Sequence, residues 1–299
     1  MRRDRPLFSR RSALAGLAAA SLTPCRGGAV AAAPGERIVA LDAPSAEMLF
    51  ALGLAPVAMS QPASVALDPA ISRAGIVDIG HYYEPNAELL QELRPDLIIR
   101  SFAAGAGVER LGRIAPIASF PIYGAGRPTL EAARLALGDL ARRLDRVEAL
   151  NAFDDVFETS LRRARAAATR YARALYLATL LPDGRHIILY GASSLFEAVM
   201  RQAGIDNAWR GPSGPWGIAT ASLEKLLAVP EAALAFIDSP TADAALKALR
   251  AGAIWNALPC VRAGLVFRLP ALEMYGALPT ALRFARLIAD GALHEAAGG

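Results

Sequence analysis

The sequence is poor in the residues that bind metals or form disulfides, with two cysteines and three histidines among 299 residues. Cys25 lies near the N-terminus, so cleavage after Ala31 would leave Cys260 as the only thiol, with no partner for an intramolecular disulfide. The three histidines share no ligand spacing; they are His81, His186 and His294. We therefore expect no metal shell built from protein side chains and a fold stabilised by packing.

Long hydrophobic runs and a strong charge of one sign are missing after residue 31. No stretch there reaches the roughly 18 consecutive apolar residues that a membrane-spanning helix needs. Six arginines against one aspartate give residues 1–31 a net charge of +5, so the remaining residues carry −1. A domain near neutrality offers no electrostatic field for phosphates, and nucleic acid is not an expected partner.

The sequence also lacks the common catalytic motifs. No P-loop occurs, and Arg110 stands where the third glycine of a dinucleotide-binding motif beginning Gly105-Ala106-Gly107 would fall. A serine follows an expected strand in residues 191–195, but Leu195 replaces the second glycine of a nucleophile elbow. These departures predict a binding protein rather than an enzyme.

The N-terminus has the pattern of an export signal. A basic segment, residues 1–11, precedes the apolar run 13–22, and the small residues 29–31 form a cleavage site. Arg10-Arg11 followed by Leu14 fits a twin-arginine signal, which exports folded proteins, and an ordinary secretory signal is the alternative. Residues 22–25 resemble a lipoprotein box, but proline precedes Cys25 where a small residue is usual, so lipidation is the less favoured interpretation.

After the signal, short apolar runs alternate with amphipathic segments, which predicts an α/β fold. A first lobe over residues 34–145 has expected strands at 37–41, 56–60, 76–79 and 96–100 and helices at 45–52 and 88–93. A second lobe over residues 169–299 has expected strands at 174–181, 186–190, 233–238 and 264–269 and helices at 194–202 and 223–228.

A long helical segment separates the two lobes. Residues 146–168 place apolar side chains along one stripe from Val147 to Ala168, after a helix that starts at Pro128 and a break near Leu144. At 1.5 Å per residue such a helix is about 33 Å long, enough to run beside two lobes. We expect two α/β lobes joined by one long helix; a single α/β domain with a long surface helix is the alternative.

Several aromatic residues lie in the segments that connect the expected strands: Tyr82, Tyr83, Phe102, Trp216 and Tyr275. Ligands of open α/β sheets bind at the carboxyl ends of strands and between domains. We expect these rings to line one cleft, although each alone fits a core or rim position equally well. Trp209 and Trp255 stand beside small residues and are expected to be structural.

The chain resembles the periplasmic ferric-hydroxamate (ferrichrome-type) siderophore-binding proteins, the substrate-binding components of ATP-driven iron importers. Short matches occur in the same order along nearly the whole chain: RIVAL at 37–41, EPNAELL at 84–90, RPDLII at 94–99, RIAP at 113–116, NAW at 207–209, WG at 216–217, PCVRAG at 259–264 and YGA at 275–277. The resemblance implies two lobes joined by one helix, a periplasmic location, a ferric siderophore held between the lobes, an inner-membrane ABC permease as partner, a monomer, and no cofactor.

In a ferric siderophore the chelator already fills all six iron positions, so the protein recognises an outer surface with aromatic walls and a few N–H or O–H donors. The resemblance implies that Trp216 matches an aromatic residue that contacts the ligand in this family. It also puts Tyr82 where the family has an arginine donor, Ala104 where it has a tyrosine donor, and Glu273 where close members have an aromatic. Our hypothesis is that Tyr82 or Tyr83 donates to the chelate and that the ligand differs from ferrichrome. Glu273 suggests a cationic group on the ligand, with a solvated rim carboxylate as the alternative.

The resemblance further implies that one glutamate on each lobe pairs with arginines of the permease; the matching residues are Glu88 and Glu224. The alternative is that both are helix-start carboxylates favoured by the helix dipole. Cobalamin or haem binding by the same fold is the second functional hypothesis, and an exported nucleotide-dependent oxidoreductase that uses the Gly105 region is the third.

Overall fold

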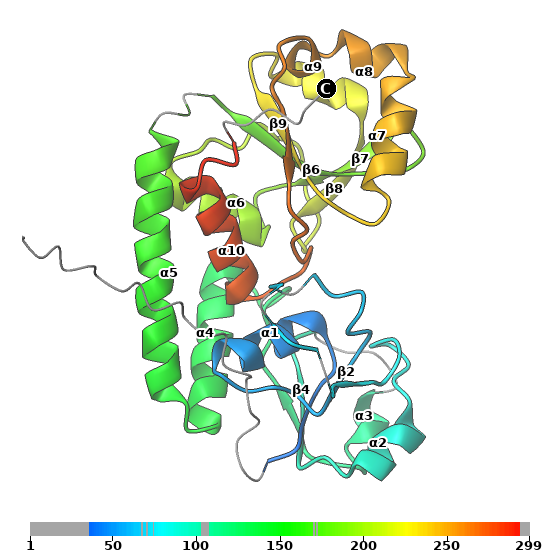
Figure 1. The fold of residues 1–299 in the computed structure, drawn as a ribbon, viewed down its shortest axis with the longest axis vertical. Helices are drawn as coiled ribbons and strands as arrows, with labels where there is room; N and C mark the ends of the chain where they lie inside the picture. The colour runs from blue at the N-terminus through cyan, green and yellow to red at the C-terminus, as the bar shows by residue number, and fades with distance from the viewer. Residues whose placement is uncertain are drawn as a thin grey trace, which may run out of the picture.

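The computed structural model describes residues 36–293, except residues 67, 70, 74, 103–107, 170 and 172. These residues form two α/β lobes, each built on a five-stranded sheet, with long helices along one side of both (Figure 1). The predicted fold class is therefore confirmed. Residues 1–31, with the expected signal peptide and Cys25, lie outside the described part of the chain, as do Ala104, the Gly105 loop and His294.

The N-terminal lobe has a parallel sheet in the order β3-β2-β1-β4-β5. Helices cover its central strands on both sides, which explains why β1 and β4 are nearly continuous apolar runs. The elements are β1 (Ile38–Ala40), α1 (Ala43–Ala51), β2 (Ala58–Met59), β3 (Val77–Asp78), α2 (Ala87–Leu93), β4 (Leu97–Arg100), α3 (Val108–Leu111) and β5 (Ile117–Ser119).

The C-terminal lobe has a mixed sheet in the order β10-β9-β6-β7-β8. β10, β9 and β6 are parallel, whereas β7 is antiparallel to both β6 and β8. The elements are β6 (Leu175–Leu180), β7 (His186–Tyr190), α6 (Leu195–Ala203), β8 (Ile218–Ser222), the 3₁₀ helix η1 (Leu223–Ala228), β9 (Ala233–Ile237), α7 (Ala242–Arg250), α8 (Ala253–Ala257), α9 (Pro259–Arg262) and β10 (Val266–Leu269).

Three helices connect the lobes. α4 (Thr129–Arg143) ends at Leu144, and α5 (Val147–Ala168) then runs along both lobes with the bounds that its apolar stripe predicts. The C-terminal helix α10 (Leu278–Ala289), drawn in red in Figure 1, packs along α5 and also contacts α1, α4 and α6. The chain crosses from β10 to the N-terminal lobe, where α10 begins beside α1, and α10 then runs back along α5 toward the C-terminal lobe. The sequence analysis did not predict this path.

One hydrophobic core extends through both lobes. It includes Leu97 of β4, Phe157 of α5, Leu177 of β6 and Phe284 of α10, all at most 1% exposed. Smaller clusters fill the outer face of each sheet, and Trp255 is buried in the one on the C-terminal lobe, against which Trp209 packs. The structural role expected for both tryptophans is confirmed.

The elements missed by the sequence analysis include the helices α7 and α10 and two edge strands. β5 and β8 lie at the outer edges of their sheets, and residues 223–228 form a 3₁₀ rather than an α-helix. Within the described residues, no helix combines the length and apolar character required to cross a membrane.

Candidate functional site

Aromatic rings from both lobes meet in one cluster. Tyr82 and Phe102 of the N-terminal lobe have ring centroids 5.6 Å apart, Phe102 lies 5.3 Å from Trp216, and Trp216 lies 5.1 Å from Tyr275 of the C-terminal lobe. All four rings are partly exposed, whereas Tyr83 is 52% exposed. We call the rings of Tyr82, Tyr83, Phe102, Tyr123, Trp216 and Tyr275 the aromatic cluster. The structure brings the five predicted aromatics together, and their role in binding stays a prediction.

Tyr123, which the sequence analysis missed, lies at the centre of the cluster. Its ring is stacked on Trp216 at 5.9 Å with an interplanar angle of 8°, and it meets Tyr275 edge-on at 5.5 Å. The ring is 4% exposed, and its hydroxyl donates to the Gly276 carbonyl at 2.8 Å. Tyr123 lies in the segment after β5. The other aromatics were selected because they lie in segments that connect strands, so Tyr123 would have been selected too if β5 had been predicted.

The turn after β3 carries three stacked rings at the exposed end of the cluster. Gly80 adopts φ +80°, a conformation that favours glycine, and the turn places His81, Tyr82 and Tyr83 side by side with centroids 4.1–5.4 Å apart. The Tyr83 backbone N–H donates to His81 Nδ1 at 3.3 Å, so the proton of a neutral imidazole lies on Nε2. His81 is therefore a third candidate donor on this turn, beside Tyr82 and Tyr83, and the sequence analysis did not propose it.

The hydroxyl of Tyr82 remains protonated over the physiological pH range. Burial raises the pKa of Tyr82 above its usual value, and a hydrogen bond with Tyr83 raises it further. A neutral phenol donates an O–H hydrogen bond, which is the function that our hypothesis assigns to this residue.

Phe102 is held in place by a buried aspartate. Asp42, which is 3% exposed, caps α1 by accepting from the Ser45 N–H at 3.0 Å. Its other oxygen accepts from the N–H groups of Ser101 and Phe102 at 2.7 and 3.1 Å. Asp42 thus joins the start of α1 to the segment after β4 and fixes the backbone that carries the Phe102 ring.

Trp216 is positioned by the turn between β7 and α6. Gly217 has φ +75°, and a Cβ there would lie 2.1 Å from the Ser194 nitrogen, so the chain passes this turn without room for a side chain. Trp216 precedes a strand rather than following one; it reaches the cluster because antiparallel β7 ends where β8 begins.

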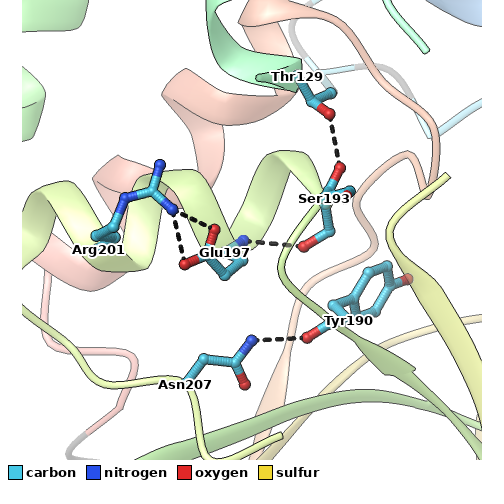
Figure 2. A network of polar contacts seen from close by, with 7 residues as sticks. Thr129, Tyr190, Ser193, Glu197, Arg201 and Asn207 are labelled. Carbon is cyan, nitrogen blue, oxygen red and sulfur yellow. Dashed lines mark hydrogen bonds and ion pairs between the residues drawn. The ribbon is translucent and has the colours of Figure 1, made fainter. Parts of the chain in front are cut away.

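A polar network fixes the same turn (Figure 2). Ser194 caps α6 by accepting from the Glu197 N–H at 3.0 Å, and Asn207 Nδ2 donates to the Tyr190 carbonyl at 2.9 Å. The Thr129 hydroxyl, at the start of α4, donates to the Ser193 carbonyl at 2.6 Å, which links the turn to α4.

Glu273 is partly exposed, and its carboxylate makes a contact between the lobes. It accepts from the Ala66 N–H of the N-terminal lobe at 3.2 Å, and Arg283 donates to the Ala66 carbonyl. Burial raises the pKa of Glu273, although backbone hydrogen bonds, from Ala66 among others, and the nearby Arg283 act in the opposite direction. The carboxyl therefore joins the two lobes, and a role toward a ligand cation stays untested.

Glu88 and Glu224 are both exposed, one on each lobe. Glu88 lies in the first turn of α2, behind the N-cap Asn86, and Glu224 lies at the start of η1. Hydrogen bonds from its own N–H and from Ser222 lower the pKa of Glu224, so it is ionised at neutral pH. Both positions suit a helix-start carboxylate as well as a docking residue.

The sequence profile of the periplasmic binding proteins matches residues 38–272, which span both sheets and the aromatic cluster up to Trp216. The chain belongs to this family. As a periplasmic binding protein, it is a substrate-binding component of transport rather than a member of an enzyme family, and its periplasmic location follows from the family.

The chain is also similar to individual periplasmic binding proteins. It is 34% identical over 288 residues to the iron(3+)-hydroxamate-binding protein FhuD of Escherichia coli K12, covering 95% of this chain and 96% of FhuD. The structure of Vibrio cholerae FhuD with Fe³⁺–Desferal superimposes with a TM-score of 0.76 at 22% identity, over 87% of this chain and 98% of that chain. The haem-binding protein BhuT with two haems matches with a TM-score of 0.65 at 23% identity, over 86% and 99%.

Proposed function

We propose that this protein captures a ferric siderophore of the hydroxamate class and delivers it to an inner-membrane ABC importer. The observation that carries the proposal is the aromatic cluster, whose partly exposed rings come from both lobes of a chain that is 34% identical to a ferric-hydroxamate-binding protein. Residues 1–31 serve as the cleaved export signal in this proposal.

The geometry suits a ligand whose iron is already coordinated. Rings of Trp216, Tyr275 and Phe102 offer apolar faces to the organic backbone of the chelate. The hydroxyls of Tyr82 and Tyr83 and the Nε2–H of His81 offer donors to chelate oxygens at the exposed end of the cluster. No bond from a protein atom to iron is part of the proposal, which assigns no catalytic residue and no resident cofactor.

A ligand panel tests the proposal. Purified mature protein is titrated with ferric Desferal, ferrichrome, haem and cobalamin, and quenching of tryptophan emission reports binding, since Trp216 lies in the cluster. We expect micromolar or tighter affinity for a ferric trihydroxamate and none for iron-free Desferal, whose uncoordinated chain lacks the compact chelate surface. Tight binding of haem or cobalamin alone would overturn the hydroxamate assignment and favour the second hypothesis.

A further inference from the structure

The C-terminal helix α10 lacks an N-terminal cap from its own sequence. Its N-cap residue is Ala277, which makes no side-chain hydrogen bond, and proline follows within the first two helical positions. The first N–H groups of a helix have no partner inside the helix and are usually satisfied by a Ser, Thr, Asp or Asn at the N-cap. The start of α10 therefore needs a partner from elsewhere.

Glu47 of α1 supplies that partner from the other lobe. Its Oε2 accepts from the Ala277 N–H at 2.6 Å, and its Oε1 accepts from the Thr280 hydroxyl at 2.5 Å. The Glu47 side chain is almost completely buried, at 2% exposed. From 230 residues away this carboxyl makes one contact of a capping box, acceptance from the N-cap N–H, and it also accepts from the side-chain hydroxyl of Thr280.

The capped end of α10 directly follows the aromatic cluster. Tyr275 and Gly276 immediately precede Ala277, and the Gly276 carbonyl accepts from the Tyr123 hydroxyl. A Cβ on Gly276 would lie 2.2 Å from Thr280 Oγ1, so the turn is pressed against the first turn of α10. The backbone on the C-terminal side of Tyr275 is thus fixed by Glu47, Tyr123 and Thr280.

We propose that Glu47 is a positioning residue for the binding site: by capping α10 across the lobe boundary, it fixes the Tyr275–Ala277 turn and hence the Tyr275 ring. This inference rests on the proposed function for its effect on affinity, whereas its effect on Tyr275 is independent of any ligand. Three charged or titratable groups act electrostatically on Glu47: Glu273 in the segment before α10, Arg283 of α10, and Tyr123 after β5.

The test observes Tyr275 directly in the full mature chain. Protein with ¹³C-labelled tyrosine rings is examined by NMR, the Tyr275 signal is assigned by its loss in Tyr275→Phe, and affinity for ferric Desferal is measured in parallel. Glu47→Ala should shift or broaden the Tyr275 signal and weaken affinity about tenfold, because an uncapped turn must be ordered on binding.

Two variants serve as controls for that result. Glu47→Gln should retain both the Tyr275 signal and the affinity, since its amide oxygen accepts from Ala277 and its amide nitrogen donates to the Thr280 oxygen. Ser45→Ala, on the same helix, removes a buried hydroxyl that has no partner in the described residues and should change neither readout.

A pH series separates positioning from general loss of structure. Burial raises the pKa of Glu47 to about 8. Between pH 7 and 9 the Tyr275 signal should follow this titration, and Glu47→Gln should abolish the response. The chain with Glu47 and the Glu47→Gln variant both carry Glu273→Gln in this series, so that titration of Glu273 does not change the Tyr275 signal.

An unchanged Tyr275 signal in folded Glu47→Ala would overturn the inference. If Glu47→Ala does not fold, Thr280→Val decides, because valine keeps the shape of threonine and removes only the hydroxyl. If the wild type fails to bind ferric Desferal, the proposed function is contradicted for that ligand, while the Tyr275 signals still decide the role of Glu47.

Discussion

At the scale of single residues, two glycines determine where the aromatic side chains lie. Trp216 and Tyr275 are each followed by a glycine at which an added Cβ would clash, with Ser194 at Gly217 and with Thr280 at Gly276. In both places the glycine lets the loop lie against the start of a helix, α6 or α10. The aromatic residue before it is therefore fixed by contacts that its own side chain does not make.

Gly217→Ala should destabilise the protein by about 2 kcal/mol or more, since it adds a steric clash with Ser194 to the strain of a positive φ. Gly53→Ala is the matched control, because Gly53 has φ +74° but nothing within 4 Å of an added Cβ. That variant should cost about 1 kcal/mol. Urea unfolding of both variants measures the difference, and equal losses would show that the Ser194 contact is unimportant.

Tyr82→Phe, which removes only the hydroxyl, should weaken affinity for the bound ferric hydroxamate by about tenfold, since one donor to the chelate is lost. Tyr83→Phe should have a smaller effect, because Tyr83 is 52% exposed and water competes for its contacts. Tyr176→Phe is the control for removing a tyrosine hydroxyl, because Tyr176 lies in the hydrophobic cluster of the C-terminal lobe that contains Trp255, outside the aromatic cluster. Unchanged affinity in a Tyr82→Phe/Tyr83→Phe double variant would contradict the donor hypothesis.

At the scale of helices and strands, the long helix α5 followed from sequence periodicity, whereas α10 and the edge strands did not. The stripe on α5 and its lack of internal breaks predicted both of its bounds. β5 and β8 are short edge strands with partly exposed residues, so neither alternation nor a continuous apolar run marks them. Missing β5 is also why Tyr123 was missed.

The contact between α1 and α10 predicts how stability depends on pH. The pKa of Glu47 is raised to about 8 in the folded protein, from 4.5, because of burial. Between these two pH values the folded protein holds a proton on Glu47 that the unfolded chain releases. The contribution of Glu47 to the free energy of unfolding is therefore complete below pH 4.5, falls as pH rises, and is lost once pH has passed about 8. For this single group, the free energy of unfolding falls by at most about 1.4 kcal/mol per pH unit.

Urea unfolding at pH 5, 6.5 and 8 measures this dependence. The free energy of unfolding of the wild type should fall with pH relative to that of Glu47→Gln, whose amide does not titrate. Parallel pH profiles for the two proteins would mean that Glu47 keeps an ordinary pKa in the folded state.

At the scale of the whole molecule, the lobes share a core and several polar contacts in addition to the long helix. α10 packs along α5 and touches α1, and Glu47, Glu273, Tyr123 and Thr129 all form hydrogen bonds between segments of the two lobes. The lobe boundaries at residues 145 and 169 stay a prediction, and the C-terminal helix contacts helices of both lobes. From these contacts we expect hinge motion between the lobes to be small.

Docking to a permease is also a property of the whole molecule, since it needs one contact on each lobe. Exchanging Glu88 and Glu224 together for arginine should abolish siderophore-dependent growth of iron-starved cells and leave ligand affinity unchanged, because charge repulsion replaces charge pairing. Glu92→Arg/Glu231→Arg makes the same charge change at other exposed glutamates of the two lobes and is the control. Equal uptake by both double variants would contradict the docking role.

The sequence by itself determined the α/β class, the long helix and five of the six aromatic residues of the cluster, because each depends on local periodicity or on residues that directly adjoin a strand. Only the tertiary structure decided that Tyr123 joins the cluster, that His81 stacks beside Tyr82 and Tyr83, that Glu273 contacts the other lobe, and that Glu47 caps α10. These contacts join residues far apart in the chain, and local patterns carry no information about which distant segments pack together.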